Sequence, residues 1–453
     1  RYLYNDTGAT LVAPRLLARG LRPTLDFGYI YGLLPLELNR WDPLGRWSIW
    51  VCVVGLALGL ARFVSTAKVG PVGVVLILLA TPDLLQSFGI ALVQAVEPVL
   101  LVHALACQAK GRRPEALAIA TVLLFVKPSM AYVYGFLIII SQAFDRPPRW
   151  RRALWPSLVA GGALTAWLGW RFGPGPLVTT LWPGAGMEVY RENHYGFFFG
   201  EGRSFWWIPN GTLRDYLRYE VGAWIAGTAV LTAGGAASLD RLIRSKDGST
   251  VDEVVVTCAI MHLSFVTFFY GQRLSWVYYY VVLICGLAAM TGPGRGRWRS
   301  VAVGVVALLT LVGSKAKVEE TVRLWREVVP AGQVGLAGVM ATPGELAEWL
   351  KVKELAAERG PAALLARTEG AAALEPRLFL DPETLYLVPG HPTPSEIQRK
   401  ADQIARANTV VRVRPKGDTT RGGFERWPEI AEALKPFLTV WEGEFYEVAQ
   451  RLD

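Results

Sequence analysis

Long apolar blocks that carry almost no charge limit how this chain can fold more than any other feature of its sequence. Residues 50–63, 88–106, 223–237 and 254–269 are the clearest of these blocks. A helix pairs its backbone polar groups internally and leaves apolar side chains to face lipid, so each block predicts a membrane-spanning helix. A soluble protein could bury one or two such helices, but the number here predicts an integral membrane protein of many helices.

The apolar blocks predict ten spans before residue 314. They lie near residues 46–63, 69–82, 88–107, 114–126, 130–144, 153–171, 221–238, 254–270, 276–291 and 299–314. The segments at 69–82 and 114–126 are short for a bilayer, so they either re-enter it or pack inside the bundle.

The composition turns globular after residue 314. Helical patterns are expected near 343–358, 394–407 and 427–436, and strand-like runs at 377–380, 384–388, 409–413, 437–441 and 445–448. Alternation of this kind is typical of a small α/β domain. The predicted fold class is therefore an α-helical polytopic membrane protein with about ten transmembrane helices and a small C-terminal α/β domain.

Basic residues occupy every second loop between the predicted spans. One set of loops holds Arg62, Lys68, Lys110, Arg112, Arg113, Arg146, Arg149, Arg151, Arg152, Arg241, Arg244, Lys246, Arg295, Arg297 and Arg299, whereas the short loops of the other set hold only Lys127 and Arg273. The positive-inside rule makes the first set cytoplasmic. This asymmetry also accounts for the net charge of +9 without a nucleic-acid partner.

The topology predicts a bacterial plasma-membrane protein of three parts, in which the first segment, the large loop of the bundle and the tail share the outer face. An outer segment covers residues 1–45, a transmembrane bundle with a large outer loop at 172–220 covers 46–314, and an extracytoplasmic domain covers 315–453. The chain starts at Arg1 without a signal-like segment, and we expect a further helix upstream of it. Chemistry is expected toward the periplasm or the cell exterior.

Several common types of site are not expected. The four cysteines lie in apolar blocks without a CxxC pair, so they are interpreted as core residues. The four histidines show no metal-ligand spacing. Because no P-loop and no GxGxxG motif occurs, a cytoplasmic nucleotide site is unsupported.

The first 32 residues hold the most informative pattern. An amphipathic segment with Leu11, Leu17 and Leu21 on its apolar side is expected to lie at the membrane surface, and Asp6 and Asp26 bracket it. A carboxylate in this position could act as general base toward an acceptor hydroxyl. The alternative is structural: Asp6 would cap the helix that follows, and Asp26 would begin a turn.

These residues resemble the first outer loop of GT-C type membrane glycosyltransferases. The pattern is Asp6, a surface helix, and then Gly20-x-x-Pro23-x-x-Asp26-Phe27-x-Tyr29-x-Tyr31-Gly32-x-Leu34-Pro35. A second stretch is similar to the same superfamily: a helix with Glu97-Pro98, the basic turn 110–113, and Lys127-Pro128-Ser129. The superfamily includes protein O-mannosyltransferases and lipid A aminoarabinose transferases.

The resemblance implies transfer of a sugar, with inversion, from a polyprenyl-phosphate donor to a glycan, lipid or protein acceptor. Asp6 would be the general base, with Asp26 as a second catalytic candidate. Lys127 and Arg273 would stabilise the lipid phosphate that leaves; the alternatives are a snorkelling lysine and a structural ion pair. A divalent metal held by Asp6 and a phosphate is a further expectation, whereas no other cofactor is implied.

Four further residues are candidates for substrate binding. Tyr29 and Tyr31 belong to the motif above, and Glu192 and His194 lie in an aromatic segment that suits either sugar stacking or an interfacial aromatic belt. Glu97 and His103 lie within an apolar span, where we favour structural roles for both.

Two other classes of function compete with the enzyme. A transporter or flippase of lipid-linked or amphipathic solutes is the main alternative, although no internal repeat occurs and the polar groups collect at one face. A membrane scaffold would leave Asp6 and the Asp26-Phe27 pair without a role.

Overall fold

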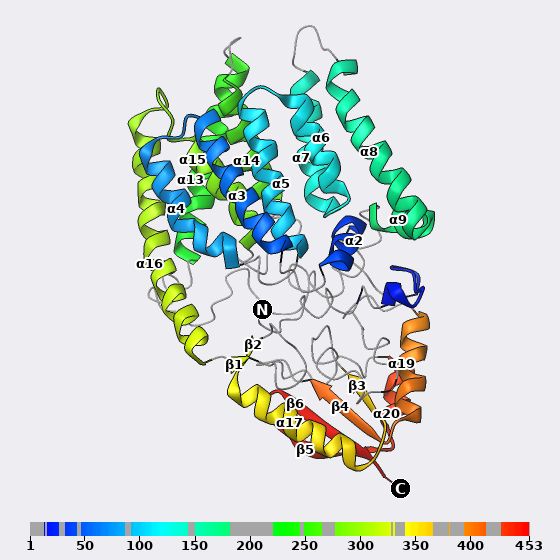
Figure 1. Cartoon of the computed structure of the whole chain (residues 1–453). Coiled ribbons are helices and arrows are strands. Elements are labelled where there is room, and N and C mark those ends of the chain that lie inside the picture. Colours follow the sequence, from blue (N-terminus) through cyan, green and yellow to red (C-terminus); the bar gives the residue numbers. More distant parts are fainter. Residues whose placement is uncertain are drawn as a thin grey trace.

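The chain folds into a large helical bundle and a small α/β domain that lies beyond one end of the bundle (Figure 1). The computed structural model describes residues 13, 16–26, 32–42, 47–86, 92–143, 150–181, 221–244, 249–264, 277–327, 329–330, 340–365, 380, 394–413 and 427–452.

Each of the ten predicted spans overlaps one helix of the bundle. These helices are α3 (Ser48–Thr66), α4 (Pro71–Gln86), α5 (Leu92–Ala109), α6 (Arg113–Leu124), α7 (Pro128–Ala143), α8 (Trp150–Phe172), α13 (Val221–Arg244), α14 (Thr250–Ser264), α15 (Val277–Ala289) and α16 (Arg297–Glu327). Leu56, Phe63, Leu105 and Leu283 are among the side chains buried between them. Two shorter helices, α2 (Leu33–Trp41) and α9 (Pro174–Leu181), complete the bundle.

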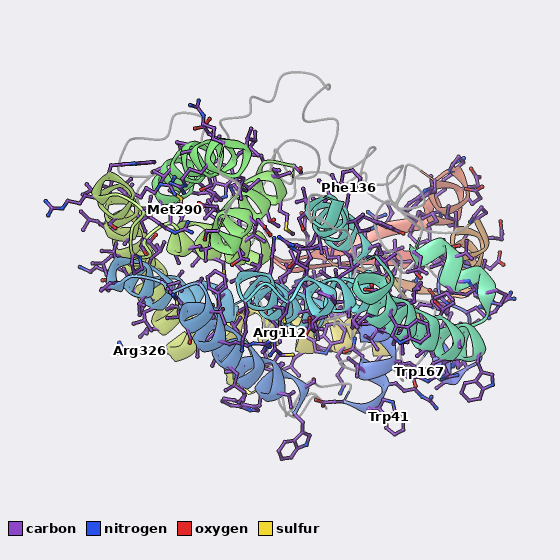
Figure 2. The ribbon with its side chains drawn as sticks, turned by 90° about the horizontal axis from the view of Figure 1, so that it is seen from above. Trp41, Arg112, Phe136, Trp167, Met290 and Arg326 are labelled. Atoms are coloured by element: carbon purple, nitrogen blue, oxygen red, sulfur yellow. The ribbon has the colours of Figure 1, made fainter. Side chains whose placement is uncertain are left out.

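Several helices expose an apolar face outward. The large exposed apolar side chains at α3 are Trp47, just before the helix, and Trp50, Val51, Val54 and Leu58 within it. Their three- and four-residue spacing places them on one side of the helix. Viewed from above, Trp41 and Trp167 also lie along the outer edge (Figure 2). Exposed apolar stripes of this kind are unusual on soluble monomers and typical of surfaces that contact lipid.

Two described helices are long and apolar enough to cross a bilayer by length and composition. They are Ser48–Thr66 and Gly222–Arg244, and shorter apolar helices occur at Pro71–Pro82, Ala95–Ala109 and Ala131–Ser141. The positions of the helices thus match the spans predicted from the sequence. The expected count of about ten membrane crossings stays a prediction.

The loops of the bundle group at two ends. The domain-facing end holds α2, α9 and the start of α7, and the hydroxyl of Tyr132 there donates to the carbonyl of Leu181. At the opposite end, Thr250 Oγ1 donates to the Ala109 carbonyl (2.8 Å), and the Gly70 N–H donates to Thr291 Oγ1 (3.0 Å). Among the described loops, this grouping matches the alternation expected from charge, so Lys127 and the described basic loops lie at different ends.

Helix α16 continues well past the predicted end of the last span. It runs to Glu327, and Lys315 and Glu319 form an exposed pair (4.0 Å) one turn apart on it. The boundary that the sequence places at residue 315 therefore falls inside a helix that extends toward the α/β domain (Figure 1).

The α/β domain has a four-stranded sheet in the order β3-β4-β6-β5. Its strands are β3 (Ala362–Leu365), β4 (Thr409–Val413), β5 (Phe437–Glu442) and β6 (Tyr446–Arg451), of which β3 and β4 are parallel and the other neighbours antiparallel. In the register, Val410 faces Ala449.

Helices cover both faces of this sheet. Helix α17 (Pro343–Glu358) packs on one face, where the rings of Trp349 and Tyr446 lie 5.3 Å apart. Helices α19 (Pro394–Arg406) and α20 (Pro428–Leu434) supply Ile404 and Ile430 to the core of the other face. A two-stranded ribbon, β1 (Val329–Pro330) with β2 (Met340–Ala341), precedes α17.

Most predicted elements of this domain that fall on described residues match the structure. Helices α17, α19 and α20 and strands β4, β5 and β6 lie where the sequence predicts them, whereas β1, β2 and β3 were not predicted. The predicted strand at 384–388, and that at 377–380 apart from Leu380, lie outside the described residues.

Candidate functional site

The segment that precedes α2 is bound to the turn between α6 and α7. The N–H of Gly32 donates to the carbonyl of Val126 (3.0 Å), and the N–H of Leu34 donates to the carbonyl of Phe125 (3.0 Å). A Cβ atom on Gly32 would lie 2.0 Å from the Phe125 carbonyl oxygen, so only glycine allows this approach. Two motifs about ninety residues apart in sequence are thus side by side at the domain-facing end.

The turn that receives this segment ends with Lys127. Helix α6 ends at Leu124, the N–H groups of Val126 and Lys127 both donate to the Leu123 carbonyl, and Pro128 begins α7. Proline suits the first helical position because its nitrogen has no hydrogen to satisfy. The Lys-Pro pair therefore fixes the lysine backbone at the entry of α7.

Lys127 forms an ion pair with Glu97 of α5. The distance from Nζ to Oε2 is 3.2 Å, and the side chain of Glu97 is fully buried while that of Lys127 is 10% exposed. The second oxygen of Glu97, Oε1, has no hydrogen-bond partner among the described residues. A buried carboxylate needs its partner, so Glu97 holds the ammonium group of Lys127 in place at this end of the bundle.

A second buried carboxylate anchors α2 to α8. Glu37 accepts from Arg40 Nη1 (3.3 Å) and from Arg171 Nε (3.3 Å), and its side chain is 4% exposed. Leu33 and Leu36 of α2 pack in one apolar cluster with Phe125. Helix α2 is thereby fixed by charge on one side and by apolar packing on the other.

The surface segment before α2 follows the amphipathic pattern expected for it. Leu16 is buried against the same cluster, Leu17 and Leu21 pack at its edge, and Arg19 and Arg22 are exposed. Residues 16–18 are helical within the described part of the chain.

Asp26 closes a turn with Arg22. Its carboxylate accepts from the Arg22 N–H (2.8 Å), from Nε (3.0 Å) and from Nη2 (3.3 Å). These bonds to Arg22 lower the pKa of Asp26 from its ordinary value near 3.8. The structural alternative expected Asp26 to begin a turn, whereas it ends one here. A catalytic role for Asp26 stays a prediction.

The α/β domain contacts the same turn. Arg399 of α19 donates to the backbone carbonyl of Asp26. This contact brings a helix of the C-terminal domain against the segment that leads to the Phe27–Tyr31 motif (Figure 1).

Six of the predicted site residues lie outside the described part of the chain: Asp6, Tyr29, Tyr31, Glu192, His194 and Arg273. Of the predicted site residues, the structure therefore places Lys127 and Asp26. No group of three or more metal-binding side chains occurs in the ranges that the structure describes, and a metal at Asp6 is not tested by them.

The structural roles expected for other polar residues hold within the bundle. His103 Nε2 lies 3.0 Å from the carbonyl of Gly55, and the four cysteines are free and buried. Sequence reasoning did not find Glu37, Arg171 and Arg399. The only signal for Glu37 was a carboxylate that follows the apolar start of α2, and a carboxylate is rarely exposed to lipid without a partner.

Comparison with known proteins finds one distant likeness. No protein-family description and no curated protein matches the chain. A solved structure of the arabinofuranosyltransferase AftD from Mycobacteria is similar over 98% of this chain and 38% of that chain, at 17% identity and a TM-score of 0.43. The likeness thus spans well under half of the AftD chain, and at this TM-score it carries no argument about function.

Proposed function

We propose that this chain is a membrane glycosyltransferase of the GT-C type, which acts at the domain-facing end of its bundle. The observation that carries the proposal is the contact of Gly32 and Leu34 with the turn that ends at Lys127. The family resemblance rests on these two motifs, and a shared site requires them to be neighbours.

The donor in this proposal is a polyprenyl-phosphate sugar. Asp6 takes the proton of an acceptor hydroxyl, whose oxygen attacks the anomeric carbon from the side opposite the leaving group. The bond from that carbon to the phosphate oxygen breaks, and the lipid phosphate keeps the electron pair. The configuration at the anomeric carbon is therefore inverted.

Lys127 stabilises the charge that develops on the lipid phosphate. Glu97 holds its ammonium group at a fixed position before the donor binds, and fixed cations stabilise a transition state without reorganising during the reaction. Arg273 is proposed as a second cation, and Tyr29, Tyr31, Glu192 and His194 as contacts to the sugar or the acceptor. For Asp26, the ion pair with Arg22 favours positioning of the loop over proton transfer.

The domain-facing end is proposed to face outward from a bacterial plasma membrane. Among the side chains that the structure describes at the opposite end, ten are cationic and four are carboxylates. The cations are Arg62, Lys68, Lys110, Arg112, Arg113, Arg241, Arg244, Arg295, Arg297 and Arg299, and the carboxylates are Glu115, Asp240, Asp252 and Glu253. An excess of this size favours the cytoplasmic side for that end.

A transfer assay tests the proposal. The full chain is reconstituted in sealed liposomes with a panel of radiolabelled polyprenyl-phosphate sugars and cell-envelope extract as acceptor. Label that moves from lipid into product supports a glycosyltransferase. Label that crosses the bilayer while still attached to lipid, with no product, contradicts it and favours the transporter.

A further inference from the structure

We infer that the opposite end of the bundle holds a binding site for the phosphate headgroup of an anionic membrane lipid. The site is built by Arg295 and Arg299 where α16 packs against α13. It lies at the other end of the molecule from the proposed donor site, and it does not depend on the proposed reaction.

Arg299 is the residue that requires an anion. It is 1% exposed, and within the described part of the chain no carboxylate lies at ion-pair distance from it. Its Nη1 lies 3.4 Å from Ser238 Oγ, and its Nε has no hydrogen-bond partner there. Burying a charge without an opposite charge is costly, so a ligand that supplies one is strongly favoured.

The neighbouring charges do not supply the missing anion. Asp252 is the carboxylate beside this group, and it already pairs with Arg295 (3.3 Å) and with Arg241. Glu253 pairs with Arg113, and Asp240 pairs with Arg244 one turn away on α13. Asp252 is thus already paired with two guanidinium groups, and no ion pair of Arg299 occurs among the described residues. A phosphate diester, whose two non-bridging oxygens share one negative charge, suits the remaining donors, because guanidinium groups bind phosphate in a forked geometry.

The start of α16 adds to the positive potential. The helix begins at Arg297, and its first turn holds no acidic residue. The N-terminus of a helix carries a partial positive charge, so basic residues are ordinarily unfavourable there and an anion is favourable. The sequence thus places Arg297 and Arg299 in the first turn of the helix, where a bound anion is favourable.

The surface next to these arginines is apolar, which points to a lipid rather than to free phosphate. On α16, Trp298, Val301 and Val305 are 51%, 66% and 52% exposed, and on α13, Leu239 and Ile243 are 45% and 76% exposed. A phospholipid whose phosphate binds Arg299 can lay its acyl chains along these side chains. Free phosphate would make no use of them.

A binding titration tests the site. The full chain in neutral detergent is titrated with fluorescent phosphatidylglycerol and then challenged with unlabelled phosphatidylglycerol, phosphatidylcholine or inorganic phosphate. We expect phosphatidylglycerol to displace the probe and the other two to be far weaker. Phosphatidylcholine carries the same phosphate diester but no net charge, so equal competition by it overturns the preference for an anionic lipid. Equal competition by inorganic phosphate overturns the assignment of a lipid as the ligand.

Matched variants locate the binding. Arg299→Gln is expected to weaken the affinity for phosphatidylglycerol by about tenfold, the loss of one charge-assisted contact. Arg297→Gln removes the same charge from an exposed position two residues away and is expected to change the affinity less than about twofold.

A second variant covers the case in which Arg299→Gln does not fold. Arg295 lies in the segment that connects α15 to α16, and its side chain is 10% exposed. Arg295→Gln is expected to weaken the affinity for phosphatidylglycerol as well. The proposal is overturned if Arg295→Gln and Arg297→Gln bind alike, because general attraction to positive charge then explains the binding.

Discussion

The backbone N–H of Gly32 donates a 3.0 Å hydrogen bond to the carbonyl of Val126. This bond joins the segment after Asp26 to the turn before Pro128, and the next residue of that turn is Lys127. The two parts of the candidate site are therefore positioned by backbone atoms, whatever side chains surround them.

Replacing Gly32 by alanine should separate these two parts. The new Cβ would lie 2.0 Å from the Phe125 carbonyl oxygen, and relieving that clash requires a backbone shift. We expect the free energy of unfolding to fall by about 1–3 kcal/mol and transfer activity to fall with it. Thermal unfolding in detergent and the transfer assay measure the two effects. Gly162→Ala is the control, because nothing lies within 4 Å of its added Cβ; equal effects of both variants would contradict the account.

Removing the charge of Lys127 should destabilise the bundle through Glu97. In Lys127→Met the fully buried Glu97 carboxylate loses its ion-pair partner, and losses of this kind cost about 3–5 kcal/mol. The drop in unfolding temperature of Lys127→Met measures this loss of stability. Lys110→Met is the control, because Lys110 is exposed at the opposite end of the bundle.

The double variant Glu97→Gln/Lys127→Met separates stability from chemistry. Without either charge, most of the lost stability should return, since no buried charge is left unpaired. Transfer activity should stay low, because the cation that faces the lipid phosphate is still absent. Activity that recovers together with stability would show that Lys127 is structural only.

The Asp26–Arg22 pair should make the stability of the loop depend on acid pH. Because the folded protein lowers the pKa of Asp26, the pair stabilises at neutral pH, and this contribution is lost as pH falls through the lowered pKa. The difference in unfolding temperature between wild type and Asp26→Asn should therefore be constant down to about pH 5 and shrink below about pH 4. Asp240→Asn, which breaks an exposed pair with the same four-residue spacing, should show a smaller difference throughout. If the difference in unfolding temperature between wild type and Asp26→Asn grows as the pH falls, the stabilising role of the Asp26–Arg22 pair is refuted.

Arg399 should protect the turn at Asp26 from hydrogen exchange. Its guanidinium donates to the Asp26 carbonyl, and the Asp26 N–H in turn donates to the Arg22 carbonyl (2.9 Å). We expect Arg399→Ala to raise the exchange rate of residues 16–26 several-fold, measured by mass spectrometry. Gln398→Ala is the control, because its amide bonds to Asp402 within the same helix. Unchanged exchange in Arg399→Ala would mean that the domain does not hold this turn.

The helices of the bundle could be predicted because each corresponds to a long apolar block of the sequence. The length and composition of a block indicate a helix, and its ends indicate roughly where the helix begins and ends. The end of α16 could not be predicted, since Lys315 and Glu319 interrupt the apolar pattern while supporting a solvated helix at four-residue spacing. Strand β3 was missed because its sequence, Ala-Ala-Leu-Leu, has no β-branched or aromatic residue and is defined by pairing with β4.

The contacts of the candidate site were less predictable than its location. The charge pattern indicated one end of the bundle for residues 1–45 and Lys127, and the structure brings Gly32 and Lys127 together there. The pairing of Glu37 with Arg171 joins residues 134 positions apart and follows from packing alone. For Asp26 both a turn and a catalytic role were open, and its bonds to Arg22 place it at the end of a turn rather than at the beginning of one.

The rate of sugar transfer by Asp6→Asn, compared with wild type, tests the central claim most directly. The account predicts a folded variant whose transfer rate falls by about two orders of magnitude or more, because asparagine cannot accept the proton. It also predicts that the wild-type product has the opposite anomeric configuration to the donor. Transfer that continues unchanged in Asp6→Asn, or a product with the donor's configuration, would contradict the account.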